Sequence, residues 1–152
     1  MIHATTQFVN HFSRVIKAAE KARLQSLRRS AFAVYTAARE SIKSGDGPSA
    51  PGTPPHTHTA GIVKSKRSKR FGMKRYGALP RSIKYDVDRD GMTAVIGPTL
   101  KDTGMAGYAH EFGADRPDTR TIEHYPARPF MQPAMQAVLG KIPGEWAGSI
   151  GG

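Results

Sequence analysis

The sequence predicts an α+β fold, in which a long N-terminal amphipathic helix and a C-terminal helix pack on a small antiparallel sheet and a long extended arm loop is attached. Three observations support this class. Residues 1–43 repeat apolar side chains every three or four positions, residues 83–88 alternate apolar with polar ones, and residues 44–80 are rich in proline, glycine and basic residues. The 152 residues suffice for a single domain, with the sheet and last helix in residues 81–142 and a C-terminal tail in residues 143–152.

The first helix is predicted from Thr6 to Lys43, because its apolar spacing is helical and no proline or glycine interrupts it. Such a helix is long for a small domain, so a break between Arg23 and Ser26 is an open alternative. Gly45 supplies the C-terminal stop. The apolar positions are Phe8, Phe12, Val15, Ile16, Ala19, Leu27, Ala31, Val34, Tyr35, Ala38 and Ile42.

The segment from Ser44 to Pro80 is predicted to be an arm. It begins with closely spaced prolines and glycines, which favour turns and polyproline II, and continues into a basic run. Loops of this length inside a compact domain are unusual and often functional. We expect the arm to be disordered in the free subunit and to become ordered on a neighbouring subunit or another partner.

An antiparallel hairpin is predicted next. Residues 83–87 alternate apolar and polar side chains, residues 88–91 have turn composition, and residues 92–96 supply the returning strand, with Gly97-Pro98 closing the hairpin. Residues 108–112 form a third short element, either a strand or a helical turn.

Residues 113–125 are predicted to be a charged loop, and the last helix to begin near Pro133, a residue favoured in a first helical turn. Its apolar stripe is Met135, Val138, Leu139 and Ile142, and Pro143-Gly144 ends it. Trp146 and Ile150 are isolated apolar anchors in the tail.

The formal net charge of +11 requires a partner explanation, and nucleic acid, an acidic protein surface and anionic lipid are all candidates. The absence of cysteine excludes disulfides and suits a reducing cytoplasm. Polar residues interrupt every apolar run before Gly45, which argues against a signal peptide. No stretch approaches the roughly 20 apolar residues of a membrane span.

The basic run in the arm is the strongest candidate for a binding feature. Clustered lysine and arginine neutralise phosphates, and Phe71 and Tyr76 could stack on bases. The alternative is contact with an acidic protein surface. The basic residues are Lys64, Lys66, Arg67, Lys69, Arg70, Lys74 and Arg75.

An apparent calcium motif fails in detail. Asp86, Asp88 and Asp90 match the first half of a calcium-binding loop, but Gly97 stands where a bidentate carboxylate is required. An acidic hairpin turn is therefore the preferred interpretation.

The histidine motifs are also incomplete. His56 and His58 have no cluster of further metal ligands nearby, and His110-Glu111 is followed by Ala114 where a zinc protease has its second histidine. Phosphate-binding loops and nucleophile motifs are missing as well. We therefore expect a protein that is not an enzyme and that uses no cofactor or metal.

Five short sequence phrases follow one another over roughly residues 51–150. They are SAPGTPPHTHT at 49–59, LPRSI at 79–83, VIGP at 95–98, YAHEFG at 108–113, and YPARPFM at 125–131 followed by Pro133-Ala134. Together they resemble the head–tail joining and minor tail proteins (neck and tail-completion components) of tailed bacteriophages. The basic insertion between His58 and Leu79 is longer than in that family.

The resemblance implies a structural virion protein that forms a homo-oligomeric ring in the neck or upper tail and is assembled in the host cytoplasm. Its partners would be copies of itself, the portal or other connector and head-completion proteins, and tail proteins, with genomic DNA in the channel and no membrane. A tail terminator, or a nucleic-acid-binding protein acting through the basic arm, is the alternative. Predicted interface residues are Pro54, Pro55, His56, His58, Glu111, Phe112, Arg128, Phe130 and Trp146.

Arg128 has a mechanistic interpretation of its own. Pro126 and Pro129 fix the backbone on both sides of it, so its side chain is presented in a set direction. A bidentate contact with a carboxylate suits such an arginine, and Glu111 is the candidate. A solvated arginine leading into the helix is the alternative.

Overall fold

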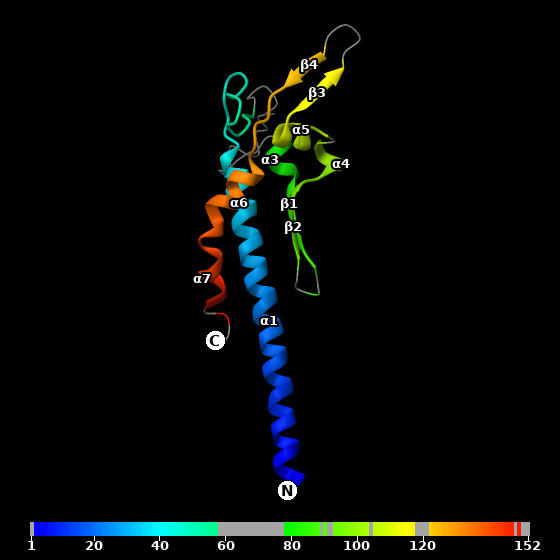
Figure 1. Cartoon of the computed structure of the whole chain (residues 1–152), viewed down its shortest axis with the longest axis vertical. Coiled ribbons are helices and arrows are strands. Elements are labelled where there is room, and N and C mark those ends of the chain that lie inside the picture. Colours follow the sequence, from blue (N-terminus) through cyan, green and yellow to red (C-terminus); the bar gives the residue numbers. More distant parts are fainter. Residues whose placement is uncertain are drawn as a thin grey trace, which may run out of the picture.

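The computed structural model describes residues 2–57, 78–88, 90, 93–103, 105–117, 122–147 and 149. Its main feature is helix α1 (Ile2–Ser41), which runs along the long axis of the molecule (Figure 1). The helix has no interruption, so a break between Arg23 and Ser26 is excluded, and it begins before the predicted Thr6. An alanine-rich sequence without proline or glycine explains this continuity.

The core lies around the C-terminal half of α1. It consists of side chains from the end of α1 and the residue after it, from β1, from the turn that leads into α6 and from α6 itself, with Phe130 and Ile83 fully buried. The clustered residues are Ala38, Ile42, Ile83, Phe130 and Ala134, against which Tyr35, Ala37, Leu79, Ile96 and Met131 pack. The α+β class is confirmed.

A short helix, α3 (Ala78–Ser82), leads into the predicted antiparallel hairpin of β1 (Ile83–Val87) and β2 (Ala94–Pro98). The returning strand lies two residues later than predicted, and Gly97 and Pro98 pair with β1 instead of closing the hairpin. Helices α4 (Leu100–Thr103) and α5 (Ala106–Phe112) follow, so residues 108–112 are helical.

The prediction of a charged loop over residues 113–125 is wrong. This segment contains a second antiparallel hairpin, β3 (Ala114–Pro117) with β4 (Ile122–Tyr125), separate from the first sheet. His124 Nδ1 and Asp115 Oδ1 lie 2.8 Å apart across the strands. Charged residues conceal the pairing, because the strands of a two-stranded antiparallel ribbon need no continuous apolar face.

Helix α6 (Met131–Leu139) begins two residues earlier than predicted and packs along α1. Pro143-Gly144 does not end the helical region, since both residues belong to a further short helix, α7 (Ile142–Ala147), which also contacts α1. Proline is tolerated there because it lies in the first turn, where its missing N–H has no helical acceptor.

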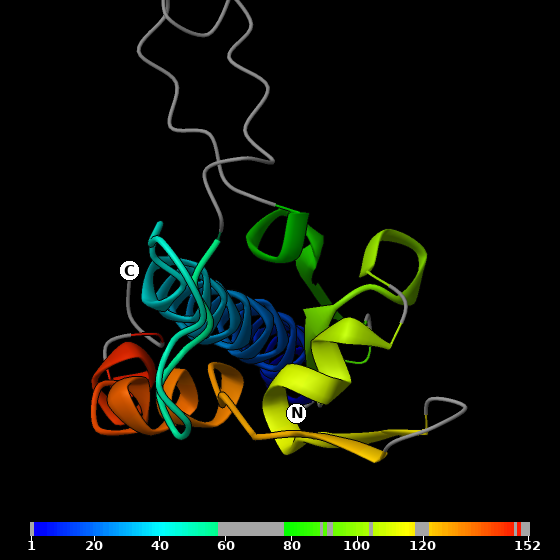
Figure 2. The ribbon, with the colours of Figure 1, turned by 90° about the horizontal axis from the view of Figure 1, so that it is seen from above.

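Residues 44–57 are not a free arm. Thr57 N donates to Lys43 O (2.8 Å) and Gly45 N to Thr57 O (3.3 Å), so the segment leaves α1 and returns to its end. Figure 2 shows this segment crossing the end of α1 toward α6. The prediction of a disordered arm is therefore wrong for residues 44–57. The basic run of the predicted arm lies outside the described residues.

Candidate docking groove

The upper end of the molecule is organised by Glu111 on α5, which caps helix α6. Its Oε2 accepts hydrogen bonds from the backbone N–H groups of Phe130 (2.9 Å) and Met131 (3.0 Å), and its Oε1 accepts one from Gln132 (2.9 Å). The local N-cap residue is Phe130, whose side chain makes no capping hydrogen bond. A carboxylate from α5 thus satisfies the free N–H groups of α6 and interacts favourably with its dipole.

Arg128 ties the proline-rich segment to the same region. Its Nε donates to Ser49 O (2.8 Å), its guanidinium lies over the Tyr125 ring (4.8 Å from carbon to centroid), and its backbone N donates to His110 O (2.6 Å). Both earlier expectations for Arg128 are wrong: in the described structure its guanidinium is neither paired with Glu111 nor solvated, since the residue is buried. Backbone carbonyls take the place of the carboxylate.

We call Ser49, Gly52, Glu111, Ala127 and Arg128 the clasp. A further bond, Gly52 N to Ala127 O at 2.9 Å, completes it. The clasp joins three segments distant in sequence and fixes the turn that places Phe130 in the core.

Two glycines permit the close approach of these segments. At Gly107 a Cβ would lie 2.4 Å from Pro98 Cγ, and at Gly113 it would lie 3.0 Å from Tyr125 O. Gly113 also has φ 78°, which side-chain-bearing residues rarely adopt. Helix α5 can therefore lie directly against β2 and the end of β4.

His110 is half-buried beside the clasp. Its ring meets Tyr125 edge to face at 5.5 Å between centroids, and its Nδ1 is buried without a hydrogen-bond partner. Burial lowers the pKa of His110 below its usual 6.5, and the Arg128 charge lowers it further. The neutral imidazole is thus the form that the fold favours.

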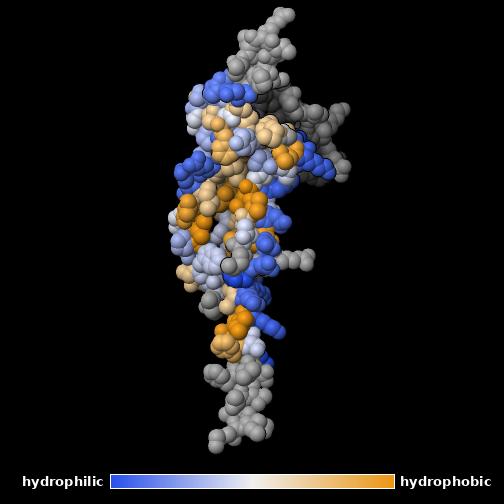
Figure 3. Space-filling model, turned by 45° about the vertical axis from the view of Figure 1, so that its right-hand side comes forward, coloured by the Kyte–Doolittle hydropathy of each residue, from blue (hydrophilic) through white to orange (hydrophobic). Residues whose placement is uncertain are grey.

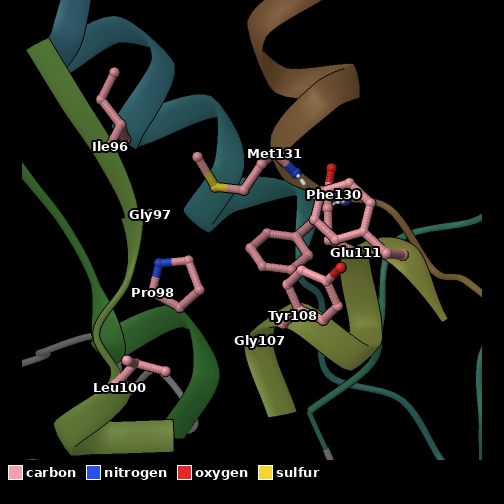
Figure 4. Close-up of a pocket in the computed structure, with 10 residues that line it drawn as sticks. Ile96, Gly97, Pro98, Leu100, Gly107, Tyr108, Glu111, Phe130 and Met131 are labelled. Carbon is pink, nitrogen blue, oxygen red and sulfur yellow. Dashed lines mark hydrogen bonds between the residues drawn. The ribbon is translucent and has the colours of Figure 1, made fainter. Parts of the chain in front are cut away.

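An apolar groove of about 380 Å³, which we call the upper groove, opens beside the clasp. Figure 4 shows Ile96, Pro98 and Leu100 along one wall and Tyr108, Glu111 and Phe130 along the other. Gly97, Gly107, Phe112 and Met131 complete the lining.

The chemistry of the upper groove suits binding of an apolar side chain. Leu100 is 69% and Phe112 66% exposed, and the rings of Tyr108 and Phe112 contact each other at a tilt of 45°, with centroids 4.7 Å apart. Glu111 is the one carboxylate in the lining, and its oxygens are occupied by the N-terminus of α6. Exposed aromatic and aliphatic residues around a concave surface are typical of protein docking sites.

The described residues contain neither a cluster of metal ligands nor a membrane-spanning helix. Among them, His, Asp and Glu residues nowhere gather in threes. Asp88 and Asp90 lie in the β1–β2 turn, where Asp90 N donates to Asp88 Oδ1 (3.5 Å), as expected for an acidic turn. None of the described helices combines the length and apolar character needed to cross a bilayer.

No family model, curated protein or solved structure matches this chain.

Eight of the nine predicted interface residues lie in the described chain and fall into two groups. Phe112, His56 and Trp146 are exposed, while Pro54 and Glu111 are partly exposed, and for these an interface role stays a prediction. Pro55, Phe130 and Arg128 are buried within the subunit. The residues that lie outside the described chain are His58, Lys64, Lys66, Arg67, Lys69, Arg70, Lys74 and Arg75.

Sequence reasoning missed several residues of the clasp and groove. Ser49 takes part through its carbonyl oxygen, which no side-chain pattern reveals. Leu100 and Met131 lack a periodic pattern because they lie at the start of short helices. Tyr108 could have been identified from the sequence, since an aromatic residue four positions before Phe112 predicts that both lie on one helical face.

Proposed function

We propose that this chain is a structural subunit of a tailed-phage virion, a ring-forming component that joins head to tail, and that the upper groove receives an apolar side chain of a connector or tail protein. One observation carries the proposal. The phrases that resemble the phage family, separated in sequence, meet in one cluster at the upper end of the molecule.

The contacts between these phrases are specific. The SAPGTPP phrase binds Arg128 of the YPARPFM phrase through Ser49 O, and Glu111 of the YAHEFG phrase caps the helix that follows YPARPFM. Thr99, directly after the VIGP phrase, donates its N–H to Ser82 O of the LPRSI phrase (2.9 Å). The phrases therefore build the clasp and the upper groove, which gives a physical reason for finding them together.

Electron microscopy of a lysate in which this gene is interrupted tests the proposal. We expect DNA-filled heads beside separate finished tails. Tails of abnormal length would support the tail-terminator alternative instead, and normal infectious particles would contradict a structural role in the virion.

Complementation tests the role of the groove. A copy with Leu100→Asp should leave heads and tails unjoined, because a charge in the apolar groove opposes docking. Val95→Asp is the matched control, since Val95 is equally exposed, at 70%, but does not line the upper groove. Equal infectivity of both variants would contradict docking in the groove.

Nucleic-acid binding is a second candidate, favoured by a basic stripe on α1. Arg14, Lys17, Lys21 and Arg28 are all exposed and lie on one face of the helix at spacings of three, four and seven residues. DNA affinity that falls steeply with salt, and less steeply after substitution of these residues, is the expected signature. Salt-independent or absent binding would count against this function.

A further inference from the structure

The N-terminal half of α1 exposes an apolar stripe that none of the elements the structure describes buries. Phe12, Val15 and Ile16 are 60%, 62% and 46% exposed, and with Ala19 they follow the i, i+3, i+4, i+7 spacing of one helical face. We call these four residues the N-terminal stripe. Figure 3 shows apolar surface toward this end of the helix, in the lower part of the molecule.

The same face is buried further along the helix. Ala22, Ser26 and Ser30 continue it at intervals of three and four residues, and all three are buried, with Ser26 Oγ donating to Glu145 O of α7 at 3.1 Å. The N-terminal stripe is thus the uncovered continuation of an intramolecular interface. Apolar surface of this kind is favourably removed from water by a partner.

The molecule also carries an apolar groove suited to such a stripe. This α1 groove, of about 200 Å³, is floored by α1 and walled by β2 on one side and by α6 and α7 on the other. The residues from α1 are Leu27, Ser30, Ala31 and Val34, which repeat the spacing of the stripe fifteen residues later. The other lining residues are Ala94, Ile96, Met135, Ile142 and Trp146.

We infer that the N-terminal stripe docks into the α1 groove of a second copy of this chain. The uncharged groove favours an apolar partner such as this stripe over an acidic one. The net charge of +11 makes copies of the chain repel one another, so a contact between copies is opposed least where apolar surfaces meet. The groove lining contains no charged residue, and the basic residues Arg14, Lys17 and Lys21 lie on the face of the helix opposite the stripe.

Arg23 favours one direction of the contact. In an antiparallel arrangement that pairs residues 12–19 with residues 34–27, a two-fold axis passes Arg23, which brings two positively charged side chains to the same part of the interface. Arg23 lies on the stripe face and its Nη2 donates to Asp90 O of its own chain (2.7 Å). The head-to-tail arrangement avoids this like-charge contact. A head-to-tail contact closes into a ring or extends into a filament.

This inference rests on the proposed function only in that copies of the chain associate, and the test separates the two. The chain has no cysteine, so introduced thiols are the only ones present. The full chain with Ile16→Cys and Met135→Cys is oxidised and run on a non-reducing gel. Residue 16 precedes the α1 part of the groove by about 16 Å of helix, beyond disulfide reach within one copy.

The expected result is a ladder of covalent multimers from the double variant and no species beyond dimers from either single variant. A two-fold contact would give closed dimers only, and efficient dimers from Arg23→Cys would overturn the head-to-tail direction. Absence of cross-links in a protein that still forms oligomers would overturn this docking mode, and a strictly monomeric chain would overturn the inference altogether. If the double variant forms the ladder and phage with the interrupted gene still gives normal particles, the proposed function is refuted and this inference stands.

Adjacent substitutions supply the matched control. Ile16→Asp should reduce self-association at least tenfold in sedimentation equilibrium, whereas Lys17→Asp, on the opposite face, should not. Circular dichroism of both variants establishes that the helix is retained. Equal loss in both would overturn the apolar contact.

Discussion

Two phenylalanines summarise how the two ends of the molecule differ. Phe130, at the clasp, is fully buried, although its rigid proline-flanked phrase predicted a role at an interface. Phe12, on the N-terminal stripe, belongs to a helical pattern that predicts burial, yet it is 60% exposed. An apolar helical pattern therefore identifies a face whose burial is favourable, but it does not show that the subunit's own chain buries that face.

The sharpest test of this comparison is to replace each phenylalanine by alanine and to measure the stability of the chain. Phe130→Ala should lower the free energy of unfolding by about 3–5 kcal/mol, because it leaves a cavity in the core. Phe12→Ala in the monomeric chain should change it by less than about 0.5 kcal/mol. Urea denaturation at low protein concentration measures both free energies. Similar losses of stability would show that the N-terminal stripe is buried within the subunit.

Removing the cap of α6 should have the next largest effect. Glu111→Ala leaves three backbone N–H groups without their acceptor and should cost about 2 kcal/mol. Glu20→Ala, an exposed carboxylate on the N-terminal half of α1, is the control and should cost less than about 0.5 kcal/mol. A neutral Glu111→Ala would mean that water caps α6 equally well.

Backbone strain gives a smaller contrast. Gly113→Ala should lower stability by about 1–2 kcal/mol, since its φ of 78° disfavours any side chain. Gly140→Ala should raise it by about 0.4–1 kcal/mol, because Gly140 has a helical φ of −66° and open space around it. Thermal unfolding of the two variants should shift in opposite directions, and a shared direction would contradict the strain argument.

The smallest expected effect is a pH dependence at the clasp. Because the folded-state pKa of His110 lies below 6.5, the unfolded chain binds more protons as the pH falls through that value, and stability should decrease. The contribution is fully present above pH 6.5 and is lost below the folded pKa. His110→Gln should flatten the unfolding profile in this window; an unchanged slope would show that other groups cause it.

The sequence was sufficient for the elements with strong periodicity. The helix of α1 and the β1–β2 hairpin follow from spacing and turn composition. The clasp was not predictable, because it depends on backbone groups such as Ser49 O, which carry no residue-specific signal. The β3–β4 hairpin was missed for a related reason: its charged, exposed strands lack the alternation by which strands are identified.

The uninterrupted length of α1 has a consequence for any assembly that the chain builds. From Phe12 to Ser41 the helix rises by about 44 Å. No glycine or proline lies between them to absorb bending. The N-terminal stripe and the upper groove are therefore held at a set separation, and the length of α1 would fix the spacing of the two proposed contacts. Inserting residues there would change both that spacing and, by 100° per residue, the direction in which the stripe faces.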